Sequence, residues 1–122
     1  MDVVLVVEDD VNIRDMTSLL LEDAGYEVLA AQNAAQALQL SEQRRDISVV
    51  FTDVNLHDGT NGIELARQLK ARGSRAGTVV VSGDLGWAET PLDEDMRFLA
   101  KPYCRQMLLA AVAEACARMR RG

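Results

Sequence analysis

The 122-residue chain contains few of the residues that build disulfide frameworks or zinc sites: two cysteines and one histidine. Cys104 and Cys116 fall in one expected helix, where twelve residues rise about 18 Å. That rise exceeds the roughly 7 Å between Cα atoms that a disulfide allows, so we expect two reduced thiols. The single histidine, His57, is far from both cysteines in the chain, and a zinc site is therefore not expected.

The chain also lacks a long apolar run and an excess of basic residues. No segment approaches the roughly 20 apolar residues that span a bilayer, and no basic stretch precedes an apolar one at the start, as a signal peptide would require. The net charge of −6 argues against non-specific binding to DNA or to an anionic membrane. We therefore expect a cytoplasmic protein that contacts neither nucleic acid nor membrane.

What is present fits one globular domain over residues 1–122. Hydrophobic residues make up 48% of the chain and charged residues 26%, as in ordinary folded domains. A chain of this length buries roughly two-thirds of its unfolded surface, so it needs neither a disulfide nor a metal to fold.

Hydrophobic patterning predicts strands that alternate with helices. Continuous apolar runs rich in β-branched residues predict strands buried on both faces at 3–7 and 47–52, and shorter segments predict further strands at 27–30, 78–81 and 96–100. Helical spacing predicts a helix after 8–10 that stops at Gly25, one that Asn33 caps, one over 63–71 and one over 103–120. In the first helix, Ile13, Met16 or Thr17, Leu20 and Ala24 are expected to face inward.

This alternation predicts an α/β fold with a parallel sheet covered by helices on both faces. Gly86 and Pro91 oppose a long helix in the stretch 83–95, so we expect at most one or two helical turns there. In such sheets, ligands bind beyond the carboxyl ends of the strands. The residues that follow each strand are therefore the candidates for function.

Carboxylates, one amide, one hydroxyl and one ammonium stand at or just after the ends of the predicted strands. They are Glu8, Asp9, Asp10, Asp53, Asn55, Ser82, Asp84 and Lys101. Clustered carboxylates repel one another unless a cation is present, and oxygen ligands without sulfur or imidazole indicate Mg²⁺ or a similar ion. A carboxylate beside such an ion is a nucleophile toward phosphorus. Each group alone is an ordinary turn or cap residue, and only their order on successive strand ends makes the set specific.

Four segments in this order resemble the signature blocks of the response-regulator receiver domain: 4–10, 51–56, 80–83 and 98–103. The resemblance covers essentially the whole chain. It implies a doubly wound, flavodoxin-like (βα)5 fold with strand order 2-1-3-4-5. The helix between the fourth and fifth strands is expected to be short or irregular, because only 18 residues separate Ser82 from Lys101.

The resemblance also implies a metal site and a phosphoacceptor. Asp53 would be the phosphoacceptor. Asp9 and Asp53 would bind Mg²⁺ directly, Glu8 would act largely through water, and the backbone carbonyl of Asn55 would complete the set.

The same resemblance implies a switch around the phosphoryl group. Lys101 would pair with that group, the Ser82 hydroxyl would move to bind it, and Phe98 would rotate with Ser82. Pro102 would follow a cis peptide bond. For Phe98, the alternative is an ordinary core aromatic of the last strand.

Besides the short spacing between Ser82 and Lys101, His57 and the pair Asn55 and Asp84 depart from the family pattern, and Trp87 is a further residue with two interpretations. His57 stands where the family usually has proline, and it is either exposed or a group that tunes the pocket. Asn55 and Asp84 either orient a water for self-dephosphorylation or face solvent. Trp87 is either a packed cover for a short helix or an anchor for a partner.

The sequence therefore predicts a signalling receiver, not an enzyme for other substrates. A sensor histidine kinase or a histidine phosphotransfer protein would donate the phosphoryl group, and an unidentified downstream protein would receive the signal, unless the chain only drains phosphate. No output domain follows the last helix, and the opening Met1 favours a stand-alone protein, but a receiver cut from a larger hybrid kinase or regulator would have the same sequence features. Two alternatives stay open: a receiver-like binding module that is never phosphorylated, and an aspartate-nucleophile phosphatase, which would need an acid where Asn55 stands.

Overall fold

The computed structural model describes residues 2–56, 59–83 and 95–121. Its strands are β1 (Val3–Val7), β2 (Glu27–Ala31), β3 (Ile47–Asp53), β4 (Gly77–Ser82) and β5 (Met96–Ala100). Its helices are α1 (Val11–Asp23), α2 (Ala34–Gln43), α3 (Gly62–Ala71) and α4 (Arg105–Arg121). These bounds agree with the sequence prediction to within two residues.

All strand pairs are parallel, and the sheet order is β2-β1-β3-β4-β5. The predicted doubly wound, flavodoxin-like fold is therefore confirmed. The register aligns Asp53 with Val81 and Ser82 with Ala100, so the carboxyl ends of the central strands lie at one edge of the sheet.

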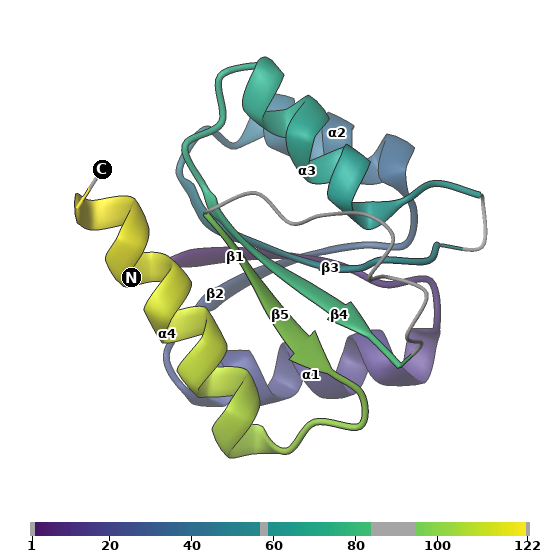
Figure 1. Cartoon of the computed structure of the whole chain (residues 1–122), viewed down its shortest axis with the longest axis vertical. Coiled ribbons are helices and arrows are strands. Elements are labelled where there is room, and N and C mark those ends of the chain that lie inside the picture. Colours follow the sequence, from purple (N-terminus) through teal and green to yellow (C-terminus); the bar gives the residue numbers. More distant parts are fainter. Residues whose placement is uncertain (1, 57–58, 84–94, 122) are drawn as a thin grey trace.

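Two apolar cores explain why the strands are buried on both faces. Successive side chains of β1 point to opposite faces: Val4 and Val6 belong to the core under α1 and α4, and Leu5 and Val7 to the core under α2 and α3. Figure 1 shows α2 and α3 above the sheet and α1 and α4 below it. Because both faces are covered, polar chemistry is confined to the ends of the strands.

Side-chain caps fix where the helices begin. The carboxylate of Asp10 accepts hydrogen bonds from the backbone N–H groups of Asn12 and Ile13 at the start of α1. Asn33 and Asn61 cap α2 and α3 in the same way. The expected stop of α1 is also present, because Gly25 has a φ of 99°, a conformation that favours glycine.

The buried face of α1 differs in part from the expectation. Thr17 and Leu21 are its buried residues, whereas Met16 is 64% exposed and Ala24 is exposed. The helix is rotated so that positions four apart meet the sheet, which turns Met16 toward solvent. The expected inward positions of Ile13 and Ala24 were therefore wrong, because both residues are exposed. Of the alternatives Met16 and Thr17, Thr17 is the buried one.

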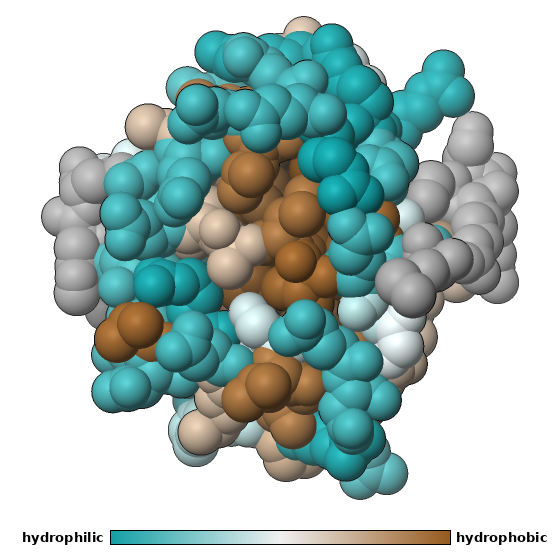
Figure 2. Space-filling view, turned by 180° about the vertical axis from the view of Figure 1, so that it is seen from behind, coloured by the Kyte–Doolittle hydropathy of each residue, from teal (hydrophilic) through white to brown (hydrophobic). Residues whose placement is uncertain are grey.

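Strand β2 forms one edge of the sheet and is less buried than the others, with Glu27 to Leu29 only half-buried. Seen from behind, the molecule has a hollowed apolar region bordered by hydrophilic surface (Figure 2). Cys104 and Cys116 are not joined by a disulfide. No helix in the described ranges is long and apolar enough to cross a bilayer.

Several sequence predictions lie outside the described residues. They are the short helix expected between β4 and β5 and the roles considered for His57, Asp84 and Trp87.

Candidate functional site

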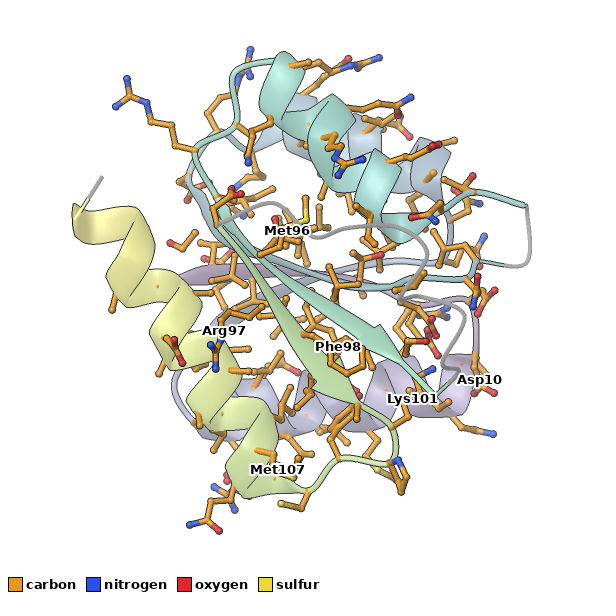
Figure 3. The ribbon with its side chains drawn as sticks, in the orientation of Figure 1. Asp10, Met96, Arg97, Phe98, Lys101 and Met107 are labelled. Atoms are coloured by element: carbon orange, nitrogen blue, oxygen red, sulfur yellow. The ribbon has the colours of Figure 1, made fainter. Side chains whose placement is uncertain are left out.

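An ammonium and two carboxylates meet at the carboxyl end of the sheet. The Lys101 Nζ lies 2.5 Å from Oδ2 of Asp53 and 3.7 Å from Oε1 of Glu8. Glu8 directly follows β1, Asp53 ends β3 and Lys101 directly follows β5. Figure 3 shows Lys101 at the same end of the molecule as Asp10. The parallel topology thus gathers groups that are up to 93 residues apart in the chain, from Glu8 to Lys101.

The three side chains are shielded to different degrees, with exposed fractions of 6% for Glu8, 12% for Asp53 and 27% for Lys101. Burial is the main cause that raises the pKa of Glu8 to about 7; the charge of Lys101 opposes it and that of Asp53 adds to it. Partial burial alone would lower the pKa of Lys101, but the hydrogen bond to Asp53 and the two negative charges outweigh it, so the pKa is raised. Lys101 therefore stays a cation at neutral pH.

The backbone around Asp53 holds its carboxylate in place. Oδ1 accepts a hydrogen bond from the backbone N–H of Asn55 at 3.0 Å, while Oδ2 faces Lys101. Asn55 is tied in turn to Asn61, the cap of α3, by an isolated β-bridge. One carboxylate oxygen is thus oriented by the chain and the other by an ammonium.

The three consecutive acids after β1 have different surroundings. The buried Glu8 is held by its backbone, whose N–H donates to the carbonyl of Ala31 (3.0 Å) and whose carbonyl accepts from Arg14 (2.9 Å). Asp9 is half-buried, and Asp10 is exposed and caps α1. Of the three acids, Glu8 therefore lies beside Lys101, whereas Asp10 caps the helix.

The remaining predicted residues lie on β4 and β5 beside this cluster. Ser82 is buried at the end of β4, and its backbone carbonyl accepts a hydrogen bond from the N–H of Lys101 (3.0 Å). The peptide bond between Lys101 and Pro102 is cis. Phe98 is half-buried on β5, two residues after Met96 and therefore on the same face of the sheet (Figure 3).

Gly62 is a site residue that the sequence did not reveal. A side chain there would overlap the backbone carbonyl oxygen of Asp53 and would approach Oγ1 of Thr52 to 2.8 Å. The N–H of Gly62 donates to the carbonyl of Val54 at 2.7 Å. The start of α3 therefore packs directly behind the acidic residue, and only glycine permits this approach.

Tyr103 is a second residue beside the site whose contact the sequence did not reveal. Its hydroxyl group hydrogen-bonds to Oγ1 of Thr17 at 2.7 Å. Burial is the main cause that raises the pKa of Tyr103, and the hydrogen bond to Thr17 opposes it. The two residues are 86 positions apart in the chain, so no local pattern signals their contact.

The donor set fits a magnesium ion. Among the described side chains, no three acids, histidines or cysteines are gathered closely enough to hold a metal by themselves. The set expected from the sequence needs only two direct carboxylates, Asp9 and Asp53, with the backbone carbonyl of Asn55. Mg²⁺ keeps several waters and is commonly held by one or two carboxylates, so these oxygens are a suitable set.

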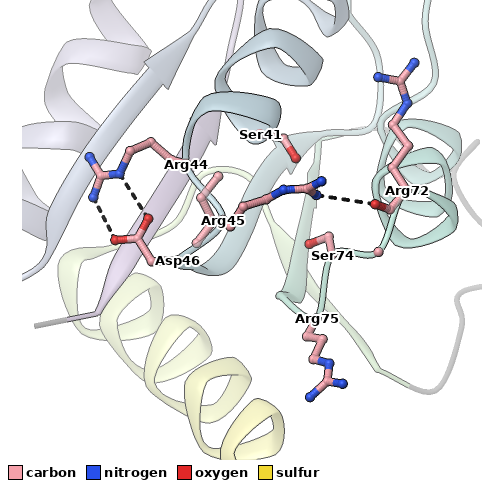
Figure 4. A pocket seen from close by; sticks show the side chains of 9 residues that line it. Ser41, Arg44, Arg45, Asp46, Arg72, Ser74 and Arg75 are labelled. Atoms are coloured by element: carbon pink, nitrogen blue, oxygen red, sulfur yellow. Dashed lines mark hydrogen bonds and ion pairs between the residues drawn. The ribbon is translucent and has the colours of Figure 1, made fainter.

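A pocket at the opposite end of the strands has a different character. Its volume is about 640 Å³, and it is lined by four arginines together with Ser41, Ser74 and other residues (Figure 4). Arg44 pairs with Asp46 and Glu27, Arg72 with Glu42, and Arg45 donates to the carbonyl of Arg72. These arginines are thus largely engaged by acids and by a carbonyl at a helix end, where cations are favoured.

The model of the response regulator receiver domain matches residues 4–113. The chain belongs to this family. The receiver is a signalling domain of two-component systems.

Known proteins and structures agree with this assignment. The chain is 32% identical over 119 residues to the transcriptional regulatory protein FixJ of Azorhizobium caulinodans, across 93% of the chain and 54% of that protein. It is 31% identical over 117 residues to the sensor kinase/phosphatase CqsS of Vibrio cholerae, across 90% of the chain and 17% of that protein. A receiver domain structure from Clostridium thermocellum matches with a TM-score of 0.87 and 27% identity, covering 98% of each chain.

The curated relatives are longer than this receiver. The chain spans about half of FixJ and less than a fifth of CqsS. One is a transcriptional regulator and the other a sensor kinase, so similar receiver domains occur in proteins with different outputs.

Proposed function

We propose that this receiver domain accepts a phosphoryl group on Asp53 from a phosphohistidine donor. The observation that carries the proposal is the contact of Lys101 with Asp53 at 2.5 Å, beside the buried Glu8 and at the carboxyl ends of the strands. A carboxylate held by a fixed cation at this edge of a parallel sheet has the position and charge that phosphotransfer requires.

The transfer forms one bond and breaks one. An oxygen of the Asp53 carboxylate attacks phosphorus, and the bond between phosphorus and the donor imidazole nitrogen breaks. The bonding pair stays on the imidazole, and the product is an aspartyl phosphate. Lys101, already at Asp53, neutralises one phosphoryl oxygen as charge develops.

Mg²⁺ would be held by Asp9, Asp53 and the Asn55 carbonyl, with Glu8 acting through water. When bound, the ion supplies positive charge for the phosphoryl oxygens. The chain itself fixes the acceptor through the Asn55 N–H, and it fixes the Lys101 backbone through the Ser82 carbonyl. These hydrogen bonds pre-organise the site before a donor arrives.

The output of the transfer is a shift between two conformations. The Ser82 hydroxyl binds the phosphoryl group and Phe98 rotates as Ser82 moves. Because Phe98 is half-buried, its rotation changes the surface that a partner contacts. The aspartyl phosphate is then lost by hydrolysis, for which Asn55 and Asp84 orient the water.

The partners follow from this chemistry. A sensor histidine kinase or a histidine phosphotransfer protein supplies the phosphoryl group in the cytoplasm, and a downstream protein reads the switched surface. The acidic receiver itself touches neither nucleic acid nor membrane.

The test is the intact mass of the protein after incubation with acetyl phosphate and Mg²⁺, followed over time. The wild type is expected to gain one phosphoryl group, and Asp53→Asn is expected to gain none, because the amide is not a nucleophile. Asp10→Asn is the matched control, since Asp10 is an acid of the same end of the sheet that caps α1; it should gain the group as the wild type does.

Decay of the added mass gives the lifetime of the phosphoryl group. An Asn55→Ala variant should hold the group longer than the wild type. If the wild type gains no mass from acetyl phosphate or from a panel of phosphorylated histidine donors, the phosphotransfer proposal fails and the domain is a binding module.

A further inference from the structure

We propose that Tyr103 is a positioning residue that holds Lys101 at Asp53 by tying the segment after β5 to helix α1 through Thr17. The inference rests on the phosphotransfer proposed for Asp53. Its basis is the 2.7 Å hydrogen bond between the two hydroxyl groups of Tyr103 and Thr17.

Thr17 is a rigid anchor for this bond. It lies in the middle of α1, and it is 2% exposed because it faces the sheet together with Leu21. A threonine side chain in a helix has few rotamers. The hydroxyl that meets Tyr103 is therefore fixed in the core and not carried by a mobile surface side chain.

The ring of Tyr103 contacts the strand that carries the acceptor. It packs edge-on against Phe51, with 5.9 Å between the ring centres and 76° between the planes. Phe51 is two residues before Asp53 on β3, so both side chains leave the same face of the sheet. Tyr103 thus bridges α1 and β3.

Only Pro102 separates this bridge from Lys101. On the other side, the Lys101 N–H is bound to the Ser82 carbonyl. The lysine is therefore held from both directions, and its ammonium reaches Asp53 and Glu8. A small cavity of about 10 Å³ is lined by Glu8, Asp53, Lys101, Tyr103 and Thr17, so the residues of the tie and of the site border the same space.

A purely structural hydrogen bond would stabilise the fold without affecting the chemistry. The two roles separate when the rate of phosphorylation, its dependence on Mg²⁺ and the surroundings of Lys101 are measured together. Tyr103→Phe keeps the ring on Phe51 and removes the hydroxyl. Thr17→Val removes the partner hydroxyl with little change in shape, and Thr17→Ser keeps it.

The first measurement is the rate of mass gain from acetyl phosphate across a Mg²⁺ titration. Tyr103→Phe and Thr17→Val should each slow the reaction by about three- to tenfold, the range expected for the loss of one hydrogen bond. The Mg²⁺ concentration that gives half the maximal rate should not change. The double variant should be no slower than either single one, and Thr17→Ser should restore most of the rate.

The second measurement reads Lys101 directly, and it does not depend on phosphotransfer. The chain has two lysines, Lys70 and Lys101, so protein labelled with ¹³C-lysine gives two resolvable ε-methylene signals. At one fixed pH, Tyr103→Phe and Thr17→Val should shift the Lys101 signal. The Lys70 signal, from a residue paired with Asp95 on the other side of the sheet, should stay in place.

Tyr26→Phe is the matched control, because it removes a hydroxyl from the residue before β2, at the amino end of the strands. If Tyr103→Phe and Thr17→Val react at the wild-type rate and leave the Lys101 signal unmoved, the positioning role is wrong while the acceptor role of Asp53 stands. If the wild type itself gains no phosphoryl group, the proposed function fails. The Lys101 signal then tests by itself whether the hydrogen bond between Tyr103 and Thr17 positions Lys101. If Tyr103→Phe does not fold, the positioning role is tested by comparing Thr17→Val, which lacks the hydroxyl, with Thr17→Ser, which keeps it.

Discussion

Gly62 shows how one missing side chain places an acceptor. Gly62→Ala would force a methyl group onto the backbone of Asp53, so either α3 or the end of β3 must move. Overpacking of this kind typically costs about 1–3 kcal/mol. We expect the free energy of unfolding to fall by that amount in urea titrations, and the rate of mass gain from acetyl phosphate to fall with it.

Gly83→Ala is the control for this prediction. It lies at the same end of the sheet, but among the described residues its new methyl group would meet the Lys101 side chain, with the nearest atom at an ordinary 3.4 Å. A Gly62→Ala protein as stable and as reactive as Gly83→Ala would show that the close approach behind Asp53 has no energetic importance.

Tyr103 gives the fold a dependence on alkaline pH. Burial raises its pKa in the folded state, whereas the unfolded chain has the ordinary tyrosine value of about 10. Above that value the unfolded state loses the phenolic proton first and the folded state keeps it. Stability from this group is therefore complete below about pH 10 and is lost as the pH rises through the folded-state pKa.

The measurement is urea unfolding of the wild type and of Tyr103→Phe on both sides of pH 10. The wild type should lose more stability than the variant across this interval. Phenolate absorbance gives the independent reading: the Tyr103 component, taken as wild type minus variant, should appear at higher pH in the folded than in the unfolded protein. Equal titration in both states would contradict the prediction.

For individual residues, the sequence predicts the positions of the charged groups of the site better than the packing contacts that hold them in place. Glu8, Asp53 and Lys101 follow buried strands, and parallel strands must bring such positions together. Gly62 and the Tyr103–Thr17 pair depend on how α3 and α1 pack against distant residues, which no local spacing encodes.

Among the elements, α1 is the helix whose two faces differ most from the sequence expectation. Leu21 is fully buried and Met16 is 64% exposed. Leu21→Ala should lower the free energy of unfolding by about 2–5 kcal/mol, because it leaves a cavity against the sheet. Met16→Ala should change it by less than about 0.5 kcal/mol.

The comparison is made by urea unfolding monitored by circular dichroism. Both substitutions introduce alanine into the same helix, so helix propensity contributes similarly and burial makes the difference. Equal losses from the two substitutions would mean that α1 packs on the sheet through a different face.

The pattern in α1 explains the error. Apolar residues are spread around this helix, and four of them are exposed: Val11, Ile13, Met16 and Leu19. Periodicity alone therefore cannot decide which stripe faces the sheet. In α3, by contrast, Ile63, Ala66 and Leu69 are buried as predicted, because polar residues occupy its outer face.

For the molecule as a whole, the alternation of strands and helices is sufficient to predict a parallel sheet with two covered faces. The order β2-β1-β3-β4-β5 came from the family resemblance, since many orders satisfy the same alternation. Composition supports one domain but says nothing of the two cores, which arise only when strands such as β1 place alternate side chains above and below the sheet.

The orientation of α4 has a practical consequence. This helix runs back along the sheet, so that Ala115, in its second half, lies against Gly77, the first residue of β4. Both marked ends of the chain in Figure 1 therefore lie away from Lys101 and Asp10, which Figure 3 shows in the same orientation. A receiver immobilised by either end on a biosensor chip would present the site of Glu8, Asp53 and Lys101 to the solution. Phosphohistidine donors could then be titrated onto it without obstruction by the attachment.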